Sequence, residues 1–259
     1  MTPSDARAGD AARTRRVVQV STWGDGSAGR LGHGAWAPTE LASPTPIDSY
    51  YFGSQPVARI ALGWRHALAL THAGLAYSWG GGARGQTGHG GREDTPSPRL
   101  VEALAREHVA AIGAGAAHSL AATRDSVVFA WGAADAGQLG VPAADVPKPE
   151  PSAEPAAARW LEPGSVEAPA VVGALWGHGV VGMDGGAEHS AFVTRDGRVL
   201  LCGDDSYGQR GDGEIGGGEG EVVLGGGGLV ALAMPRGARA RSAACGAWHT
   251  LVLAELSEE

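Results

Sequence analysis

The stretch Gly63-Trp-Arg-His66, followed by the apolar run Ala67-Leu-Ala-Leu70 and then by Trp79-Gly80, decides the fold. The same arrangement returns at Gly115-Ala-Ala-His118 with Trp131-Gly132, and at Gly186-Ala-Glu-His189 with Cys202-Gly203. In all three copies thirteen residues separate the histidine from the Trp or Cys, and a glutamine follows seven residues later, at Gln86, Gln138 and Gln209. Two offsets that recur in three copies indicate a structural repeat.

A fourth copy of the repeat is divided between the two ends of the chain. Its first half is Gly246-Ala-Trp-His249, and the matching second half is Trp23-Gly24, followed by Gly29-Arg30 at the usual offset. We therefore predict that the N- and C-terminal strands share one blade. Such a division closes a ring of repeats and hides its edge strands.

Each unit reads as short strands joined by tight turns, without an intervening helix. The apolar run after each histidine leads to a turn such as Thr194-Arg-Asp-Gly197, and Asp-Gly between two such runs is a strong hairpin signal. Glycine is abundant, with 43 of 259 residues and no collagen-like period, which indicates many tight turns. These features predict an all-β fold, specifically a β-propeller with four recognisable blades.

The repeat also resembles that of the regulator-of-chromosome-condensation family. The resemblance rests on Gly-x-x-His, an apolar strand, Asp-Gly, Trp-Gly and Gly-Gln-Leu-Gly, and it extends from about residue 17 to residue 253. It implies a β-propeller, which in that family usually has about seven blades. Because only four units can be counted, three architectures stay open: a closed ring of four or five blades, an open arc, and an incomplete version of the seven-bladed ring.

We expect a flexible N-terminal tail over residues 1–16 and a single propeller domain over residues 17–256. Two stretches lengthen the spacing between units, a Pro/Ala-rich insert at about 141–170 and a Gly-rich loop at about 211–228. Proline and glycine clusters of this kind predict loops. A degenerate fifth blade between Trp160 and Gly177 is the alternative for the first stretch.

The repeated residues are interpreted as structural. One histidine per blade is expected to hydrogen-bond a neighbouring strand instead of binding a metal, and the repeated tryptophans are expected to pack in the core. Two G-x-G-x-x-G stretches, at Gly24 and Gly80, are turns of the repeat, since no helix follows to hold a pyrophosphate. The structural positions are Gly63, His66, Trp79, Gly80, Gly115, His118, Trp131, Gly132, Gly186, His189, Gly203, Gly246, His249, Trp23 and Gly24.

Composition and motifs exclude several functional classes. The net charge of −8 disfavours direct nucleic-acid binding, which needs clustered Lys and Arg. No catalytic residue set, cofactor motif or metal motif is found. No signal-peptide core and no apolar run long enough to cross a membrane is present, so an intracellular protein, cytoplasmic or nuclear, is expected.

Variable residues in the loops between the repeated positions are the candidates for partner binding. They are Trp64, Arg65, Arg84, Glu188 and Trp248. Large aromatic and charged side chains on loops become interface anchors. We therefore expect a non-catalytic, protein-binding scaffold or adaptor. The resemblance implies the alternative, a guanine-nucleotide exchange factor for a small Ran-type GTPase. Similarity to short members of the family adds a Jumonji-C oxygenase as a candidate partner.

Overall fold

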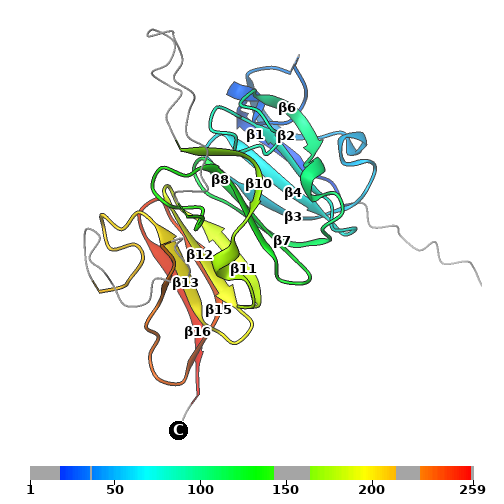
Figure 1. Ribbon diagram of the computed structural model, residues 1–259. Coiled ribbons are helices and arrows are strands. Elements are labelled where there is room, and N and C mark those ends of the chain that lie inside the picture. Colours follow the sequence, from blue (N-terminus) through cyan, green and yellow to red (C-terminus); the bar gives the residue numbers. More distant parts are fainter. Residues whose placement is uncertain (1–17, 36, 143–163, 214–227, 258–259) are drawn as a thin grey trace, which may run out of the picture.

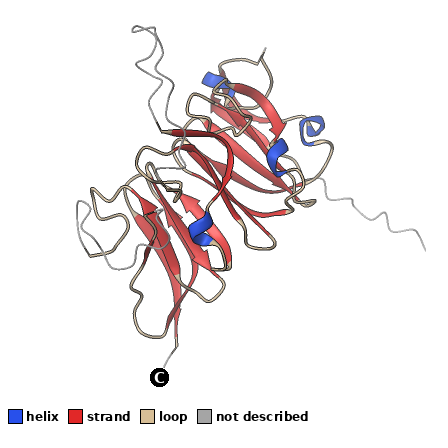
Figure 2. Ribbon diagram, in the orientation of Figure 1, coloured by secondary structure: helices blue, strands red, loops and turns tan. Residues whose placement is uncertain are grey.

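The computed structural model describes residues 18–35, 37–142, 164–213 and 228–257, and these residues are almost entirely β-structure (Figures 1 and 2). The helical segments in the described ranges are single 3-10 turns in the connections between strands. They are η1 (Ser27–Gly29), η2 (Ser49–Phe52), η3 (Glu102–Leu104) and η6 (Gly173–Leu175). The predicted fold class, an all-β arrangement of propeller blades, is confirmed.

Three complete four-stranded antiparallel blades form the middle of the chain. The first blade contains β3 (Val57–Leu62), β4 (His66–Thr71), β5 (Ala76–Gly80) and β6 (Thr95–Leu100). The second contains β7 (Val109–Ala114), β8 (His118–Thr123), β9 (Val128–Ala133) and β10 (Ser165–Val171). The third contains β11 (Val180–Gly185), β12 (His189–Thr194), β13 (Val199–Gly203) and β14 (Val230–Ala231).

Two further sheets have two strands each and lie at opposite ends of the row of blades (Figure 1). The N-terminal half-blade contains β1 (Ser21–Asp25) and β2 (Glu40–Pro46), and the C-terminal half-blade contains β15 (Ala238–Cys245) and β16 (Thr250–Leu256). The prediction that the terminal strands share one blade is therefore wrong within this chain. The described residues form an open arc, because the N-terminal half-blade lies beside the first blade and the C-terminal half-blade packs on the third, at opposite ends of the row.

The region of the predicted insert also differs from expectation. Ser165–Val171 is not part of a loop, because it pairs with β9 as the outer strand of the second blade. The connection that follows contains η6 and leads directly into β11, so no fifth blade lies in the described part of this region. Proline-rich residues 143–163, Gly-rich residues 214–227 and the predicted tail at 1–16 lie outside the described residues.

One buried apolar cluster runs across the two junctions between the complete blades, and separate clusters lie at the two outer junctions. The first-blade residues Leu68 and Leu70 share a buried cluster with Ile112 and Leu120 of the second blade, and the cluster continues to Phe192 in the third. Alternate residues of each strand point to opposite faces of the sheet. The second strand of each blade therefore contributes apolar side chains to the junctions with both neighbouring blades. Burial of this kind supplies most of the stability of a stack of repeats.

The repeat histidine links each blade to the next. The His66 Nε2 atom lies 2.9 Å from the Ser119 hydroxyl, His118 Nε2 lies 2.8 Å from the Ser190 hydroxyl, and His189 Nε2 lies 3.0 Å from the Thr250 hydroxyl. Each hydroxyl in turn donates to a backbone carbonyl, and for Ser119 this acceptor is Gln86 at 2.7 Å. The hydroxyl therefore accepts from Nε2–H, which assigns the neutral tautomer and confirms the structural interpretation of these histidines.

The glycine that precedes each histidine by three residues gives the imidazole its space. A Cβ atom on Gly115 would lie 2.0 Å from His118 Cε1 and 2.5 Å from the Gly186 carbonyl oxygen. Glycine is required here by close approach, since the next blade and the ring occupy the space of any side chain. This contact explains the Gly-x-x-His spacing of the repeat.

Burial lowers the pKa of these imidazoles. Desolvation lowers the pKa of His66 to about 4 and that of His118 to about 3. A buried histidine that must stay neutral makes folding unfavourable at acid pH, because the unfolded chain binds protons that the folded chain cannot. Its contribution to stability is complete above the unfolded pKa of about 6.5 and is lost as the pH falls below that value.

We expect the free energy of unfolding to fall by about 2 kcal/mol for each of these two histidines between pH 7.5 and pH 5.0. Urea titrations at the two pH values measure the difference. The His118→Asn variant should be less stable at pH 7.5 and lose less on acidification. His72→Asn, which changes an exposed imidazole, should behave like the unaltered protein. Equal stability at both pH values would contradict the assignment.

Candidate protein-binding face

Four loops lie side by side at one end of the blades and form what we call the loop row, residues 63–65, 115–117, 186–188 and 246–248. Each loop joins the first strand of its sheet to the second. Backbone hydrogen bonds connect successive loops: Trp64 N–H to the Ala116 carbonyl at 3.2 Å, Ala116 N–H to Gly186 at 2.9 Å, and Ala187 N–H to Ala247 at 3.0 Å. The backbone of the loop row is thus fixed, and its side chains differ from blade to blade.

Charged residues gather at the middle of the loop row. Arg84 forms an ion pair and hydrogen bond with Asp135, so it bridges the first and second blades. Glu188 lies close to this pair and to Asp204. Partial burial raises the pKa of Glu188, the Asp135 and Asp204 carboxylates raise it further, and Arg84 opposes them. Three carboxylates around one guanidinium leave an acidic surface that favours basic groups on a partner.

Trp64 and Arg65 lie at the N-terminal end of the loop row. The Trp64 side chain is 67% exposed, although its carbonyl oxygen accepts a hydrogen bond from Arg30 at 3.3 Å. Arg30 also pairs with Asp25 at 3.1 Å. The backbone of this loop is therefore held in place while the indole faces solvent.

Trp248 lies at the other end of the loop row, between β15 and β16, and is 43% exposed. Its ring packs against Tyr207, with 5.6 Å between the ring centroids and 57° between the ring planes. Tyr207 is itself exposed, so the two rings form an aromatic surface. Aromatic pairs of this kind supply large contact area with little loss of side-chain freedom.

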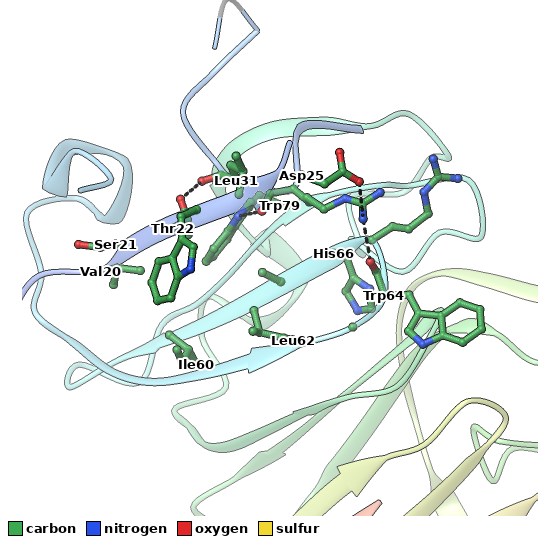
Figure 3. A pocket seen from close by; sticks show the side chains of 15 residues that line it. Val20, Ser21, Thr22, Asp25, Leu31, Ile60, Leu62, Trp64, His66 and Trp79 are labelled. Carbon is green, nitrogen blue, oxygen red and sulfur yellow. Dashed lines mark hydrogen bonds and ion pairs between the residues drawn. The ribbon is translucent and has the colours of Figure 1, made fainter. Parts of the chain in front are cut away.

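A cavity of about 300 Å³ lies beside Trp64 and is lined mainly by residues of β1, β3, β4 and the adjoining loop. In Figure 3 Ile60 and Leu62 lie on one side of the cavity, and Val20 and Thr22 on the other, while the Trp64 ring lies away from them. Its lining is mostly apolar. Within the described ranges, no three metal-ligating side chains come together.

The structure thus places all five predicted residues at the same end of the blades but does not gather them into one cluster. Arg84 and Glu188 lie close to each other at the centre of the row, whereas Trp64 and Arg65 precede β4 and Trp248 precedes β16, at the two ends of the row. Sequence reasoning missed Asp135 and Tyr207. Tyr207 lies five residues after Cys202, the same offset that separates Arg84 from Trp79, and Asp135 lies four residues after Trp131; these offsets were the available signal.

One structural prediction is wrong. Trp79 and Trp131 are buried as expected, with indole N–H bonds to the Arg30 and Gln86 carbonyls at 3.0 and 2.9 Å. Trp23 occupies the same repeat position and is 59% exposed. The difference has a simple cause: the blade half that would cover Trp23 lies at the other end of the arc.

Comparison with known proteins establishes the family. The model of the regulator of chromosome condensation (RCC1) repeat matches residues 14–70 and 73–122, and a second model of the same repeat matches residues 57–86 and 180–209. Human RCC1 domain-containing protein 1 is 30% identical over 253 residues, which cover 89% of this chain and 65% of that protein. Human E3 ubiquitin-protein ligase HERC2 is 33% identical over 197 residues, which cover 75% of this chain and 4% of the ligase.

The fold has close structural counterparts. The crystal structure of Prp20p from Saccharomyces cerevisiae, described with its binding properties to Gsp1p and histones, aligns with a TM-score of 0.68 at 22% identity and covers 92% of this chain and 51% of that one. The chain belongs to the RCC1 repeat family, and it spans less than two thirds of each of these three relatives. No helix in the described ranges is long and apolar enough to span a membrane.

The charge arrangement of the loop row can be tested on Glu188. We expect the Arg84→Gln variant to raise the pKa of the Glu188 carboxyl further, because the one neighbouring cation is removed and two carboxylates remain. A carbon-detected NMR titration of the side chain measures the shift. Arg106→Gln, which changes an exposed arginine in the connection from β6 to β7, is the control and should leave it unchanged. An unchanged pKa in the Arg84 variant would contradict the arrangement.

Proposed function

We propose that this chain is a non-catalytic protein-binding scaffold or adaptor and that the loop row is its binding face. The observation that carries the proposal is the exposure of Trp64 and Trp248 on loops whose backbone is fixed by hydrogen bonds between blades. Exposed tryptophans on a rigid frame lose little entropy on binding and are the residues that most often dominate interface energies.

The chemistry of the face indicates the kind of partner. The aromatic ends of the loop row suit apolar anchors, and the central carboxylates Asp135, Glu188 and Asp204 suit lysine or arginine side chains between them. The net charge of −8 favours a basic partner surface over an acidic one. Direct contact with nucleic acid is not part of the proposal.

Exchange of guanine nucleotides on a small Ran-type GTPase is the second candidate function. The observation that favours it is the similarity to Prp20p, whose structure is described with binding to Gsp1p. A Jumonji-C oxygenase is a further candidate partner, supported by the 30% identity to RCC1 domain-containing protein 1 and the resemblance to short family members. An intracellular site of action, cytoplasmic or nuclear, and a single domain over residues 17–256 belong to the same proposal.

The Trp64→Ala/Trp248→Ala double variant tests the binding face. We expect the variant to fold normally and to lose most of the partner proteins that the unaltered chain recovers by affinity capture, because exposed indoles contribute to binding and not to the core. Trp176→Ala is the matched control. That tryptophan is 77% exposed and follows η6, at the end of the blades opposite the loop row. Equal recovery by the double variant would refute the assignment of the face.

A nucleotide-release assay separates the two candidate functions. With a Ran-type GTPase loaded with a fluorescent guanine nucleotide, the scaffold function predicts release at the intrinsic rate when the chain is added in excess. Acceleration of about tenfold or more, corresponding to about 1.4 kcal/mol in the barrier, would establish exchange activity and replace the scaffold function.

A further inference from the structure

The two half-blades each leave one strand without a neighbour in its sheet. In every complete blade the second strand pairs with the third, as β4 does with β5. By its repeat position β16 is a second strand, and among the described residues it pairs with β15 alone. Likewise β1 is a third strand, and in the same part of the chain it pairs with β2 alone. Each half-blade therefore holds the two strands that the other lacks. Free edges of this kind are templates for strand pairing.

The repeat glycines show that both ends are open. A Cβ atom on Gly80 would lie 2.3 Å from the Arg65 carbonyl oxygen of the paired strand, but one on Gly24, at the same repeat position, would meet nothing within 4 Å. Likewise, a Cβ on Gly186 would lie 2.7 Å from the Gly246 carbonyl oxygen of the next sheet. At Gly246 the three nearest atoms all belong to the His249 ring of the same loop and strand.

The C-terminal end of the arc holds the backbone acceptor that the Trp23 indole would use in a completed blade. In the second blade Ser119 and Trp131 are directly opposite each other, and both donate to the Gln86 carbonyl oxygen. At the C-terminal end Thr250 occupies the position of Ser119 and donates to the Gln209 carbonyl oxygen at 2.8 Å. The tryptophan that would lie opposite Thr250 by repeat position is Trp23, whose ring is exposed.

Apolar surfaces at the two ends also correspond. Leu251 and Leu253 of β16 are 65% and 66% exposed, whereas Leu68 and Leu70 occupy the same positions in β4 and are buried against the second blade.

At the other end Ile60 and Leu62 of β3 are 58% and 69% exposed, whereas their counterparts Ile112 and Ala114 in β7 are buried in the cluster that holds the β4 leucines. At the junction of the first and second blades these two kinds of apolar face bury each other. At the ends of the arc one face of each kind is exposed. The cavity of about 300 Å³ beside Ile60 and Leu62 is the space that the missing strand pair would occupy (Figure 3).

A second copy of the chain fits these ends better than the chain's own opposite end. Backbone hydrogen bonds join neighbouring loops at three successive junctions, and the half-blades lie apart at the two ends of the arc (Figure 1). Closure within one chain would require these junctions to open. Two copies joined head to tail by a two-fold axis would form a ring of eight blades, within the range of about four to eight known for propellers.

We propose that β1 of one copy pairs with β16 of a second copy, so that the N- and C-terminal half-blades complete each other twice in a closed dimer. By repeat position the antiparallel register places Gly24 opposite His249, Trp23 opposite Thr250 and Ser21 opposite Val252. The pairing covers both apolar ends and gives the Trp23 indole the Gln209 carbonyl as its acceptor.

The dimer junction differs from the internal junctions at one position. Ala67 stands in the first blade where the other second strands carry Ser119, Ser190 and Thr250. His249 would therefore find no hydroxyl across the junction, and the dimer should be the weakest contact in the ring. Dissociation at low concentration is then expected, and Ala67→Ser should reduce it by supplying the missing hydroxyl.

Disulfide cross-linking tests the register directly. The Cα atoms of antiparallel partners lie about 4.5–5.5 Å apart, which a disulfide can bridge. Ser21→Cys protein mixed with Val252→Cys protein should form a cross-linked species of twice the 26.2 kDa chain mass under mild oxidation. Ser43→Cys on the outer strand β2, mixed with Val252→Cys, is the mismatched control. The unaltered chain controls for its two free cysteines, Cys202 and Cys245.

The double variant Ser21→Cys/Val252→Cys distinguishes a closed dimer from closure within one chain and from an open filament. A closed dimer gives a covalent dimer and nothing larger. Cross-linking at the mass of one chain would overturn the proposal in favour of closure within the chain, and a ladder of larger species would overturn it in favour of an open filament. No cross-link in either experiment would show that these edges do not pair in solution.

Sedimentation equilibrium supplies the energetic test. Leu251→Lys should weaken the dimer by about 10- to 100-fold, the cost of exposing one buried leucine. Leu256→Lys is the matched control, since Leu256 is equally exposed but lies beyond the strand positions that pair. Ala67→Ser should strengthen the dimer. A monomer at every concentration, or equal effects of the two lysine variants, would overturn the proposal.

Discussion

The contact between the repeat histidine and the hydroxyl of the next blade is the interaction on which the rest of the structure depends. At each internal junction an imidazole donates to a serine or threonine, and that hydroxyl donates to a backbone carbonyl of the blade from which the imidazole comes. The arrangement satisfies buried polar groups that would otherwise destabilise an apolar junction. It also sets the spacing of glycine and histidine, since the ring occupies the space of a side chain at the glycine.

A repeated junction gives the molecule both its rigidity and its curvature. Since hydrogen bonds join the loops of neighbouring blades at three successive junctions, loops at one end of the blades are held in a fixed row. Residues in this row need not pack in the core, and they differ between blades, as Arg65, Ala117, Glu188 and Trp248 illustrate. Binding residues on a frame of this kind gain specificity without a cost in stability.

Because a blade is covered only where a neighbouring blade packs on it, the two ends of the arc have exposed apolar surfaces. Trp23, Ile60 and Leu62 at one end and Leu251 and Leu253 at the other are exposed although their counterparts in complete blades are buried. Exposed apolar groups at fixed repeat positions differ from single surface leucines, which need no explanation. At the internal junctions, side chains at these repeat positions are covered by the neighbouring blade.

The sequence by itself determined the repeat, the all-β fold, the position of each histidine and glycine, and the loops that hold the candidate binding residues. These features follow from local spacing, because a strand period, a tight turn and a close approach each impose a residue type at a fixed offset. Sequence reasoning also recognised that the repeat is divided between the termini. It could not decide whether the two halves meet, since that depends on the angle summed over successive junctions.

Only the tertiary structure decided that the halves lie apart, that Trp23 is exposed and that Ser165–Val171 completes the second blade. It also brought Arg84, Asp135, Glu188 and Asp204 together from separate blades. The physical reason is the same in each case. Curvature, edge pairing and the meeting of side chains from different blades are properties of packing between units, which no offset within one unit encodes.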